Sequence, residues 1–158
     1  MIQMAVACML HHPQQVELLK KQPQLARVAV EETLRLFPPM RLLLRINESG
    51  CPVHNRPSAK GDGVLLDIVA ANRHSRFGHD AHRFNVLRDY DTARDHMSFS
   101  KGRHQCLGGG LARLEARAVL QQLFCSGNYE GLQLVEEEWV GLEGGGTFTE
   151  MTKCVVEW

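Results

Sequence analysis

The sequence predicts a mainly α-helical fold with small β-sheets, an α+β class. Three segments repeat apolar residues at about the 3.6-residue period of a helix with one buried face; they are 13–21, 23–37 and 111–124. Shorter apolar runs between glycine-rich or polar stretches are typical of strands; they are 40–46, 63–67 and parts of 130–158. A chain of 158 residues can bury roughly 70% of its unfolded surface in one core, so we expect a single domain.

The opening part of the chain is expected to be helical. Residues 1–10 are apolar at nine of ten positions, which predicts a helix buried on every side. Pro13 and Pro23 suit the first turn of two further helices, because proline has no N–H to lose there. Pro38 and Pro39 end the second of these, since proline cannot continue a helix.

Short regular elements and loops are expected to alternate in the rest of the chain. Residues 40–46 predict a strand, and 63–73 predict a strand that runs into a short helix. Residues 75–98 have weak periodicity and predict an ordered meander or a long functional loop. Residues 111–124, preceded by three glycines, form the clearest amphipathic helix, and 130–158 predict two or three short strands.

Charge is balanced over the chain but not along it. Eighteen Lys and Arg stand against eighteen Asp and Glu, which excludes a generic binder of nucleic acid or membrane surfaces. Residues 96–117 nevertheless hold four basic side chains and only Glu115 as an acidic one; the four are Lys101, Arg103, Arg113 and Arg117. Residues 130–158 hold seven Glu against Lys153 alone. The sequence therefore predicts one basic face and one acidic tail.

The cysteines indicate a reducing compartment. The five are scattered and contain no Cys-x-x-Cys pair, so they do not resemble a disulfide framework. The apolar opening segment is too short to span a bilayer, and no basic residue precedes Lys20 as a secretory signal would require. We therefore expect a cytoplasmic protein that does not enter a membrane.

The segment from Phe99 to Gly108, FSKGRHQCLG, carries the sharpest local pattern. Cys106 precedes a helix, where the helix dipole and free N–H groups stabilise a thiolate. Gly102 and Gly108 allow the tight backbone path, and Phe99 can shield the sulfur. This pattern is typical of an axial ligand loop for haem iron. A buried structural cysteine is one alternative. A glycine-rich anion loop is another, although it lacks the usual preceding strand and Lys or Ser.

Together with other motifs, this loop resembles the cytochrome P-450 family of haem-thiolate enzymes. FSKGRHQCLG matches the family pattern F-x-x-G-x-[HR]-x-C-x-G at every fixed position. Further matches follow the family order along the chain: Glu32 to Arg35 (E-x-x-R), Ala71 to Ser75 (ANRHS), the pair Arg83-Phe84, and Gly108 to Ala116 (GGGLARLEA). The resemblance implies that residues 1–158 are a single partial domain. This would be the C-terminal, haem-proximal part of the cytochrome P-450 fold, without its N-terminal half.

Individual roles follow from the resemblance. It implies that Cys106 is the proximal thiolate ligand of the iron of haem b, iron protoporphyrin IX. His104 would donate a hydrogen bond to a haem propionate, and Arg45 would reach the same carboxylates unless it is a surface arginine of its strand. Phe99 would pack beside the sulfur, and Gly102 and Gly108 would shape the loop. Many soluble members have a second glycine where this chain has Ser100, which leaves the turn of the loop less defined.

The E-x-x-R pair has two interpretations. Glu32 and Arg35 are three residues apart, so they share one helical face and can pair. A solvated surface pair of this kind contributes little. The resemblance instead implies a buried triad with Arg83 as the third partner, which locks the meander behind the cysteine loop.

The resemblance implies a monooxygenase that hydroxylates a small organic substrate with dioxygen. A nitric-oxide reductase of the same fold, or a non-catalytic haem-binding fragment (a pseudoenzyme), are the alternatives. The family's acid–threonine pair on the distal side of the haem has no counterpart in this sequence. No catalytic residue is therefore expected within the chain, and residues 1–10 would be the tail of the helix that carries the pair.

The basic face suggests a protein partner. Arg113 and Arg117 are four residues apart on the predicted helix, close in sequence to Lys101 and Arg103. In the family this surface receives the electron donor, so the resemblance implies an acidic ferredoxin or flavodoxin-type donor. A solvated helix face is the alternative.

Overall fold

The computed structural model describes residues 1–53, 55–127, 130–141 and 146–158. Its α-helices are α1 (Ile2–Leu10), α2 (Pro13–Lys21), α3 (Ala26–Leu36), α4 (Ile68–Asn72), α5 (Tyr90–Arg94) and α6 (Gly109–Cys125). Short 3-10 turns are η1 (Pro23–Leu25), η2 (Ser75–Phe77) and η3 (Gly102–His104). The strands are β1 (Leu42–Ile46), β2 (Gly63–Asp67), β3 (Gln133–Val140) and β4 (Glu150–Glu157). This architecture confirms the predicted mainly α-helical class with small sheets.

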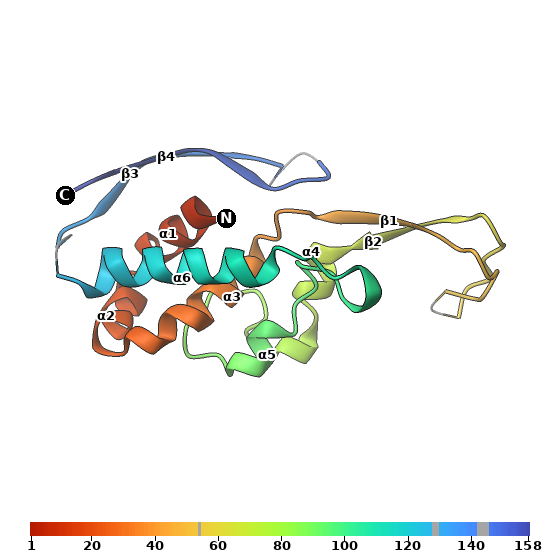
Figure 1. The fold of residues 1–158 in the computed structure, drawn as a ribbon, viewed down its shortest axis with the longest axis horizontal. Helices are drawn as coiled ribbons and strands as arrows, with labels where there is room; N and C mark the ends of the chain where they lie inside the picture. Colours follow the sequence, from red (N-terminus) through yellow and green to blue (C-terminus); the bar gives the residue numbers. More distant parts are fainter. Residues whose placement is uncertain (54, 128–129, 142–145) are drawn as a thin grey trace.

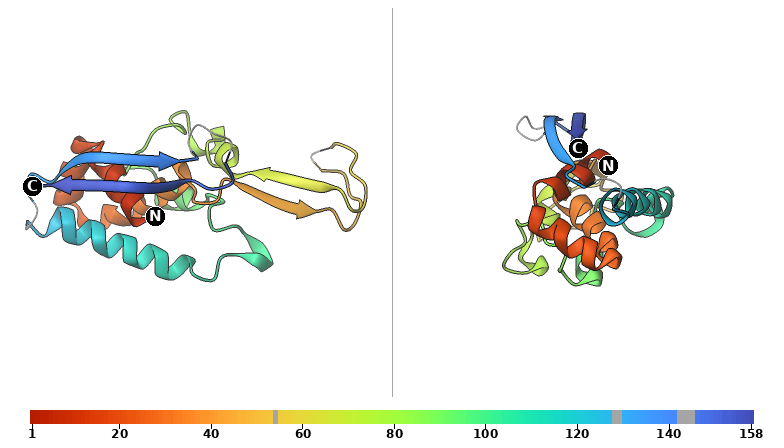
Figure 2. Two further views of the ribbon diagram at one scale, coloured as in Figure 1. Left: turned by 90° about the horizontal axis from the view of Figure 1, so that it is seen from above. Right: turned by 90° about the vertical axis from the view of Figure 1, so that its left-hand side faces the viewer.

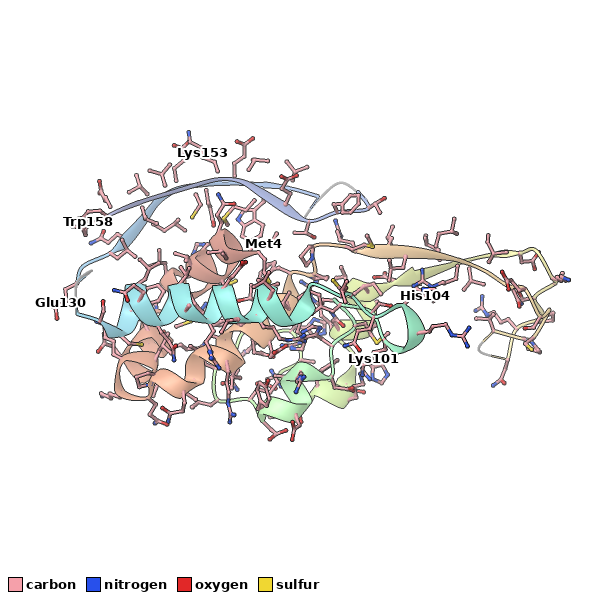
Figure 3. All side chains as sticks on the ribbon, viewed as in Figure 1. Met4, Lys101, His104, Glu130, Lys153 and Trp158 are labelled. Atoms are coloured by element: carbon pink, nitrogen blue, oxygen red, sulfur yellow. The ribbon has the colours of Figure 1, made fainter. Side chains whose placement is uncertain are left out.

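The helical body forms around α3. Figure 1 shows α1, α2, α3 and α6 grouped at one side of the molecule, and the main apolar cluster joins residues of these four helices with Phe84 and Val86. The apolar opening helix is buried as predicted, with Met4 to Met9 all inside. Elements that follow it in the chain bury it: α3 and α6 below, and the β3–β4 hairpin above. Met4, labelled in Figure 3, belongs to one apolar cluster with Met151 of β4. Proline sets the ends of the first helices as expected, since Pro13 begins α2 and α3 ends before Pro38.

Two antiparallel hairpins complete the described fold. In the first, β1 pairs with β2 in a regular register that sets Leu44 opposite Leu65. Asp67 then caps α4, because its carboxylate accepts a hydrogen bond from the Ala70 N–H at 2.9 Å. In the second, β3 pairs with β4 with two register shifts. Figure 2 shows the β3–β4 hairpin lying along the helical body, whereas the β1–β2 hairpin projects from one end.

The segment between α4 and α6 is ordered but mostly irregular, as the weak periodicity predicted. Its regular parts are η2, α5 and η3. Asp89 caps α5 through the Thr92 N–H at 2.9 Å. In the part of the chain that the structure describes, no helix combines the length and apolar character needed to cross a bilayer.

Candidate functional site

Cys106 lies in a tight loop just before α6. Its N–H donates to the Phe99 carbonyl at 2.8 Å, which closes the loop, and its carbonyl accepts from the Gly109 N–H at 3.3 Å. Gly102 has φ +77°, a conformation that favours glycine. Ser100 has φ +58°, the same left-handed region, at the position where the sequence departs from the family pattern. The loop thus forms with a serine at that turn, and the Cys106 side chain is exposed.

Phe99 packs against the start of α6. A Cβ atom on Gly109 would lie 3.2 Å from the Phe99 ring, so the helix approaches the ring closely because this residue is glycine. Gly108, by contrast, has φ −78°, and a Cβ there would meet nothing within 4 Å among the described residues. Of these two adjacent glycines, Gly109 is therefore the one with a close contact, and the shaping role predicted for Gly108 stays a prediction.

Asn72, the last residue of α4, attaches the cysteine loop to the helical body. Its side-chain oxygen accepts from the Met97 N–H at 2.7 Å, and its side-chain nitrogen donates to the Ser98 hydroxyl at 2.9 Å. Ser98 in turn donates to the Leu34 carbonyl of α3 at 2.6 Å. Asn72 is fully buried. It belongs to the ANRHS segment, but sequence reasoning gave it no role because nothing local links it to residues 25 positions away.

Glu32 and Arg35 form a buried ion pair. Arg35 Nε donates to Glu32 Oε1 at 2.6 Å and Nη2 donates to Oε2 at 2.9 Å, and both side chains have 0% exposure. The same guanidinium donates to backbone carbonyls of Asn72, Ala81 and Arg83. These contacts join α3 to α4 and to the meander, so the solvated surface alternative for this pair is wrong.

The third side chain of the triad is Arg88, and the prediction of Arg83 is corrected. Arg88 Nε donates to Glu32 Oε1 at 3.0 Å, and its Nη1 donates to Asp80 at 2.8 Å, which lowers the pKa of Asp80. Arg83 is exposed and takes part only through its backbone carbonyl. The path of the backbone accounts for this difference: the turn at 80–83 presents the Ala81 and Arg83 carbonyls to Arg35, and the Arg83 side chain is exposed.

Arg113 also differs from its prediction as part of an open basic face. Its Nε donates to Glu31 Oε1 at 2.8 Å and its Nη2 donates to Oε2 at 3.1 Å, and its side chain is only 20% exposed. His96 Nε2 contacts the same carboxylate at 3.0 Å. Burial alone would raise the pKa of Glu31, but the hydrogen bonds from His96 and Arg113 outweigh burial and lower it. The buried carboxylate of Glu31 therefore turns Arg113 inward.

The remaining predicted residues are exposed, and those of the cysteine loop and of β1 lie at one end of the molecule, whereas Arg117 lies further along α6. Figure 3 labels Lys101 and His104 on the loop before α6, at the end from which the β1–β2 hairpin projects. Lys101 forms an ion pair with Asp95, and Arg103 and Arg117 are exposed. Arg45, on β1, donates only to the neighbouring Leu44 carbonyl among the described residues, at 3.0 Å. The structure thus leaves His104 and Arg45 open to a further group without bringing them into contact.

Comparison with known proteins identifies the fold. The family model for cytochrome P-450 matches residues 8–126. The chain belongs to the cytochrome P-450 family. It is 33% identical to a biotin biosynthesis cytochrome P-450 of Bacillus subtilis over 139 residues, which are 88% of this chain and 34% of that protein. It is 36% identical to the 6-deoxyerythronolide B hydroxylase of Saccharopolyspora erythraea, covering 80% of this chain and 30% of that protein.

Solved cytochrome P-450 structures share the arrangement of elements. The crystal structure of P450BioI, in complex with an acyl carrier protein ligated to hexadec-9Z-enoic acid, superposes with a TM-score of 0.87 at 30% identity. The match covers 99% of this chain and 39% of that one. The chain therefore spans about a third of the length of the cytochrome P-450 proteins it matches.

The cytochrome P-450 family implies a haem, and the residues present fit one. Among the described residues, no group of three or more His, Cys, Asp or Glu could hold a metal ion alone. A haem needs no such group, because its own nitrogens ligate the iron and the protein adds an axial ligand. The exposed thiol before α6 is of the chemical type that can serve as such a ligand, and the neighbouring Leu107, which is 102% exposed, is an apolar surface of the kind that a flat macrocycle can cover. The donor set thus suits haem iron better than a free metal ion.

Proposed function

We propose that this chain holds the haem-thiolate site of a cytochrome P-450 monooxygenase, as part of a single domain, with Cys106 as the axial ligand of the iron. The observation that carries the proposal is the loop geometry: an exposed thiol before α6, closed by the Cys106 N–H on the Phe99 carbonyl at 2.8 Å. The haem is proposed to be haem b. The sequence has no Cys-x-x-Cys-His segment that would attach a haem covalently.

The surrounding side chains have distinct proposed tasks. His104 and Arg45, both exposed at this end of the molecule, would donate hydrogen bonds to the propionates. Gly102 gives the loop its left-handed turn, and Phe99, which packs against α6, would cover one side of the sulfur. Gly108 lacks a side chain next to Cys106, which would leave room for the macrocycle. Together these residues would bind and orient the haem, while Cys106 donates the negative charge of its thiolate.

The proposed reaction is the hydroxylation of an organic substrate with dioxygen. When bound, a thiolate-ligated haem supplies the cleavage of the O–O bond. Two relatives are named for hydroxylation, the 6-deoxyerythronolide B hydroxylase and the mycinamicin VIII C21 methyl hydroxylase of Micromonospora griseorubida. These names favour a monooxygenase over a nitric-oxide reductase of the same fold. The free state of all five cysteines supports a reducing compartment, and we propose the cytoplasm.

We further propose that an acidic electron donor, of the ferredoxin or flavodoxin type, docks on the face formed by Lys101, Arg103 and Arg117. A groove of about 250 Å³ adjoins this face between α3, α5 and α6, with Arg27, Tyr90 and Arg117 in its lining. Charge complementarity would raise the association rate more than the affinity. Arg117→Glu should therefore slow donor-supported reduction most at low salt. A rate that depends on neither salt nor this charge reversal would contradict the docking proposal.

The haem-thiolate proposal is tested by spectroscopy of the full chain loaded with haem. The ferrous–CO complex should show the red-shifted Soret band of a thiolate-ligated iron. Cys106→Ala should abolish this band, whereas Cys125→Ala, which changes a cysteine at the other end of α6, should retain it. A thiolate spectrum that survives the loss of Cys106, or its absence from the unaltered loaded chain, would refute the assignment.

A further inference from the structure

Glu31 is a second buried carboxylate, next to Glu32 on α3 but with different partners. Glu31 is 1% exposed and faces the cysteine loop through Arg113 and His96, whereas Glu32 faces the meander through Arg88. Arg113 meets the carboxylate as a fork, with two N–H groups on two oxygens. Such a fork fixes the plane of the guanidinium as well as its distance.

His96 contributes hydrogen bonds through both nitrogens of its ring. Its Nδ1 accepts from the Ser98 N–H at 3.1 Å, so the ring hydrogen lies on Nε2, which faces Glu31 Oε2 at 3.0 Å. The ring is 3% exposed. Because it uses both nitrogens in this way, His96 holds the start of the cysteine loop to α3 in one orientation.

Both partners of Glu31 also contact Phe99. The Arg113 guanidinium lies 4.6 Å from the centre of the Phe99 ring, a cation–π distance. The His96 ring centre lies 6.1 Å from it on a tilted plane. The Phe99 ring also rests on Gly109, where a Cβ would approach to 3.2 Å. The position of the ring is therefore set by side chains that Glu31 holds in place.

The position of Phe99 in turn affects the position of Cys106. Its carbonyl accepts the Cys106 N–H at 2.8 Å, so a shift of Phe99 moves the backbone of Cys106. Groups that orient the ligand of a metal typically change its affinity by about 10- to 100-fold when they are removed.

We infer that Glu31, His96 and Arg113 form a loop brace that positions Cys106 for the haem iron through Phe99. Arg113 is thus a positioning residue instead of a docking residue for the electron donor. The inference rests on the proposed haem-thiolate function and adds to it the residues that place the thiolate. His96 lies just before the loop and Arg113 lies just after it, and both contact Glu31 of α3, so the loop brace holds both ends of the loop.

The first test needs no haem. Hydrogen exchange of the Cys106 amide is followed in the full chain, with Arg113→Ala and with Arg117→Ala as the matched control one turn further along α6. Arg113→Ala should speed exchange at this amide by roughly 10- to 100-fold, because local opening becomes easier when a buried charged group loses its partner. Arg117→Ala should leave it unchanged. Equal exchange in the two variants would overturn the brace.

Arg113→Lys covers the case in which Arg113→Ala does not fold. Lysine keeps the positive charge on Glu31 but cannot form the fork or stack flat on Phe99. The chain should remain folded. Its Cys106 amide should exchange faster than in the unaltered chain and more slowly than an amide in an unstructured loop. Exchange identical to that of the unaltered chain would show that charge alone suffices and would reject the positioning by the fork.

The second test separates this inference from the proposed function. In the haem-loaded chain, Arg113→Lys should lower the fraction of ferrous–CO complex with the thiolate-type Soret band, in proportion to the faster amide exchange. Faster exchange with an unchanged thiolate fraction would reduce the brace to a purely structural role and overturn the inference. Failure of the proposed function gives a different result: the thiolate band is missing from the unaltered chain or persists in Cys106→Ala. In that case the amide exchange at Cys106 alone tests whether the loop brace holds the loop.

Discussion

Replacing Arg35 by alanine removes the guanidinium on which three separate segments converge. Arg35→Ala takes donors from the carbonyls of Asn72, Ala81 and Arg83 and removes one of the two cations beside Glu32. Breaking a buried ion pair on one side costs about 3–5 kcal/mol. Arg88 stays on Glu32, so the lower end of that range applies to the pair. Each buried acceptor without a donor adds on the order of 1 kcal/mol. This applies to the Asn72 and Ala81 carbonyls, because Arg88 also donates to the Arg83 carbonyl.

We therefore expect Arg35→Ala to lower the free energy of unfolding by about 5 kcal/mol, which is at the high end for a single substitution. For a chain of this size the midpoint of thermal unfolding should fall by roughly 10–20 °C. Urea unfolding followed by circular dichroism measures the difference. Arg27→Ala is the control, because Arg27 precedes Arg35 by two turns, is exposed, and its guanidinium stacks on the Tyr90 ring at 4.5 Å. If Arg35→Ala lowers the free energy of unfolding no more than Arg27→Ala does, the reasoning is refuted.

Three further predictions use the same unfolding measurement. Arg88→Ala should lower the free energy of unfolding by about 2–4 kcal/mol because it removes one cation from Glu32, whereas Arg83→Ala should change it little. A larger loss for Arg83→Ala than for Arg88→Ala would favour Arg83 as the third member of the triad. Ser100→Gly should raise the free energy of unfolding by about 0.5 kcal/mol, because the strain of a left-handed φ on serine exceeds the extra backbone entropy that glycine loses on folding. A lower free energy of unfolding for Ser100→Gly would argue against a left-handed turn at this residue. Folding lowers the pKa of Glu31, so the stability this group adds is present above its ordinary value of 4.5 and is lost as the pH falls below it. The deficit of Glu31→Gln should shrink over that range, and a constant deficit would contradict the shift.

The sequence predicted the elements that depend on local patterns. Apolar periodicity and proline placed α2 and α3, and the alternation of short apolar runs with loops indicated the strands, whose pairing into hairpins only the structure shows. The cysteine motif located the loop before α6 because its glycines and helix start are adjacent in sequence. In each case the information lies within a window of about twenty residues, the range over which hydrophobic periods and turn residues act.

The partners of the two buried carboxylates could not be predicted in this way. Arg83 and Arg88 lie in the same aperiodic segment, and only the path of the turn decides which side chain points toward Glu32. Arg113 looks like a surface residue of an amphipathic helix because Glu31, the group that draws it inward, is 82 positions away. Two adjacent glutamates on a helix also cannot show by spacing that both are buried. Long-range pairing of charges is therefore the part that required the structure.

The cysteine loop consists of a short turn held by residues far from it in the chain, and this affects when it can form during folding. Its anchors lie in α3 and α4, 65 residues before His96 in the case of Glu31 and 25 residues before Met97 in the case of Asn72. Contacts of that separation carry a loop-closure cost that nearby contacts avoid. We therefore expect α2, α3 and α6 to form before the loop becomes ordered. A nascent chain would then expose the Cys106 thiol in an unformed loop until the body has assembled, so capture of the prosthetic group would belong to the last stage of folding.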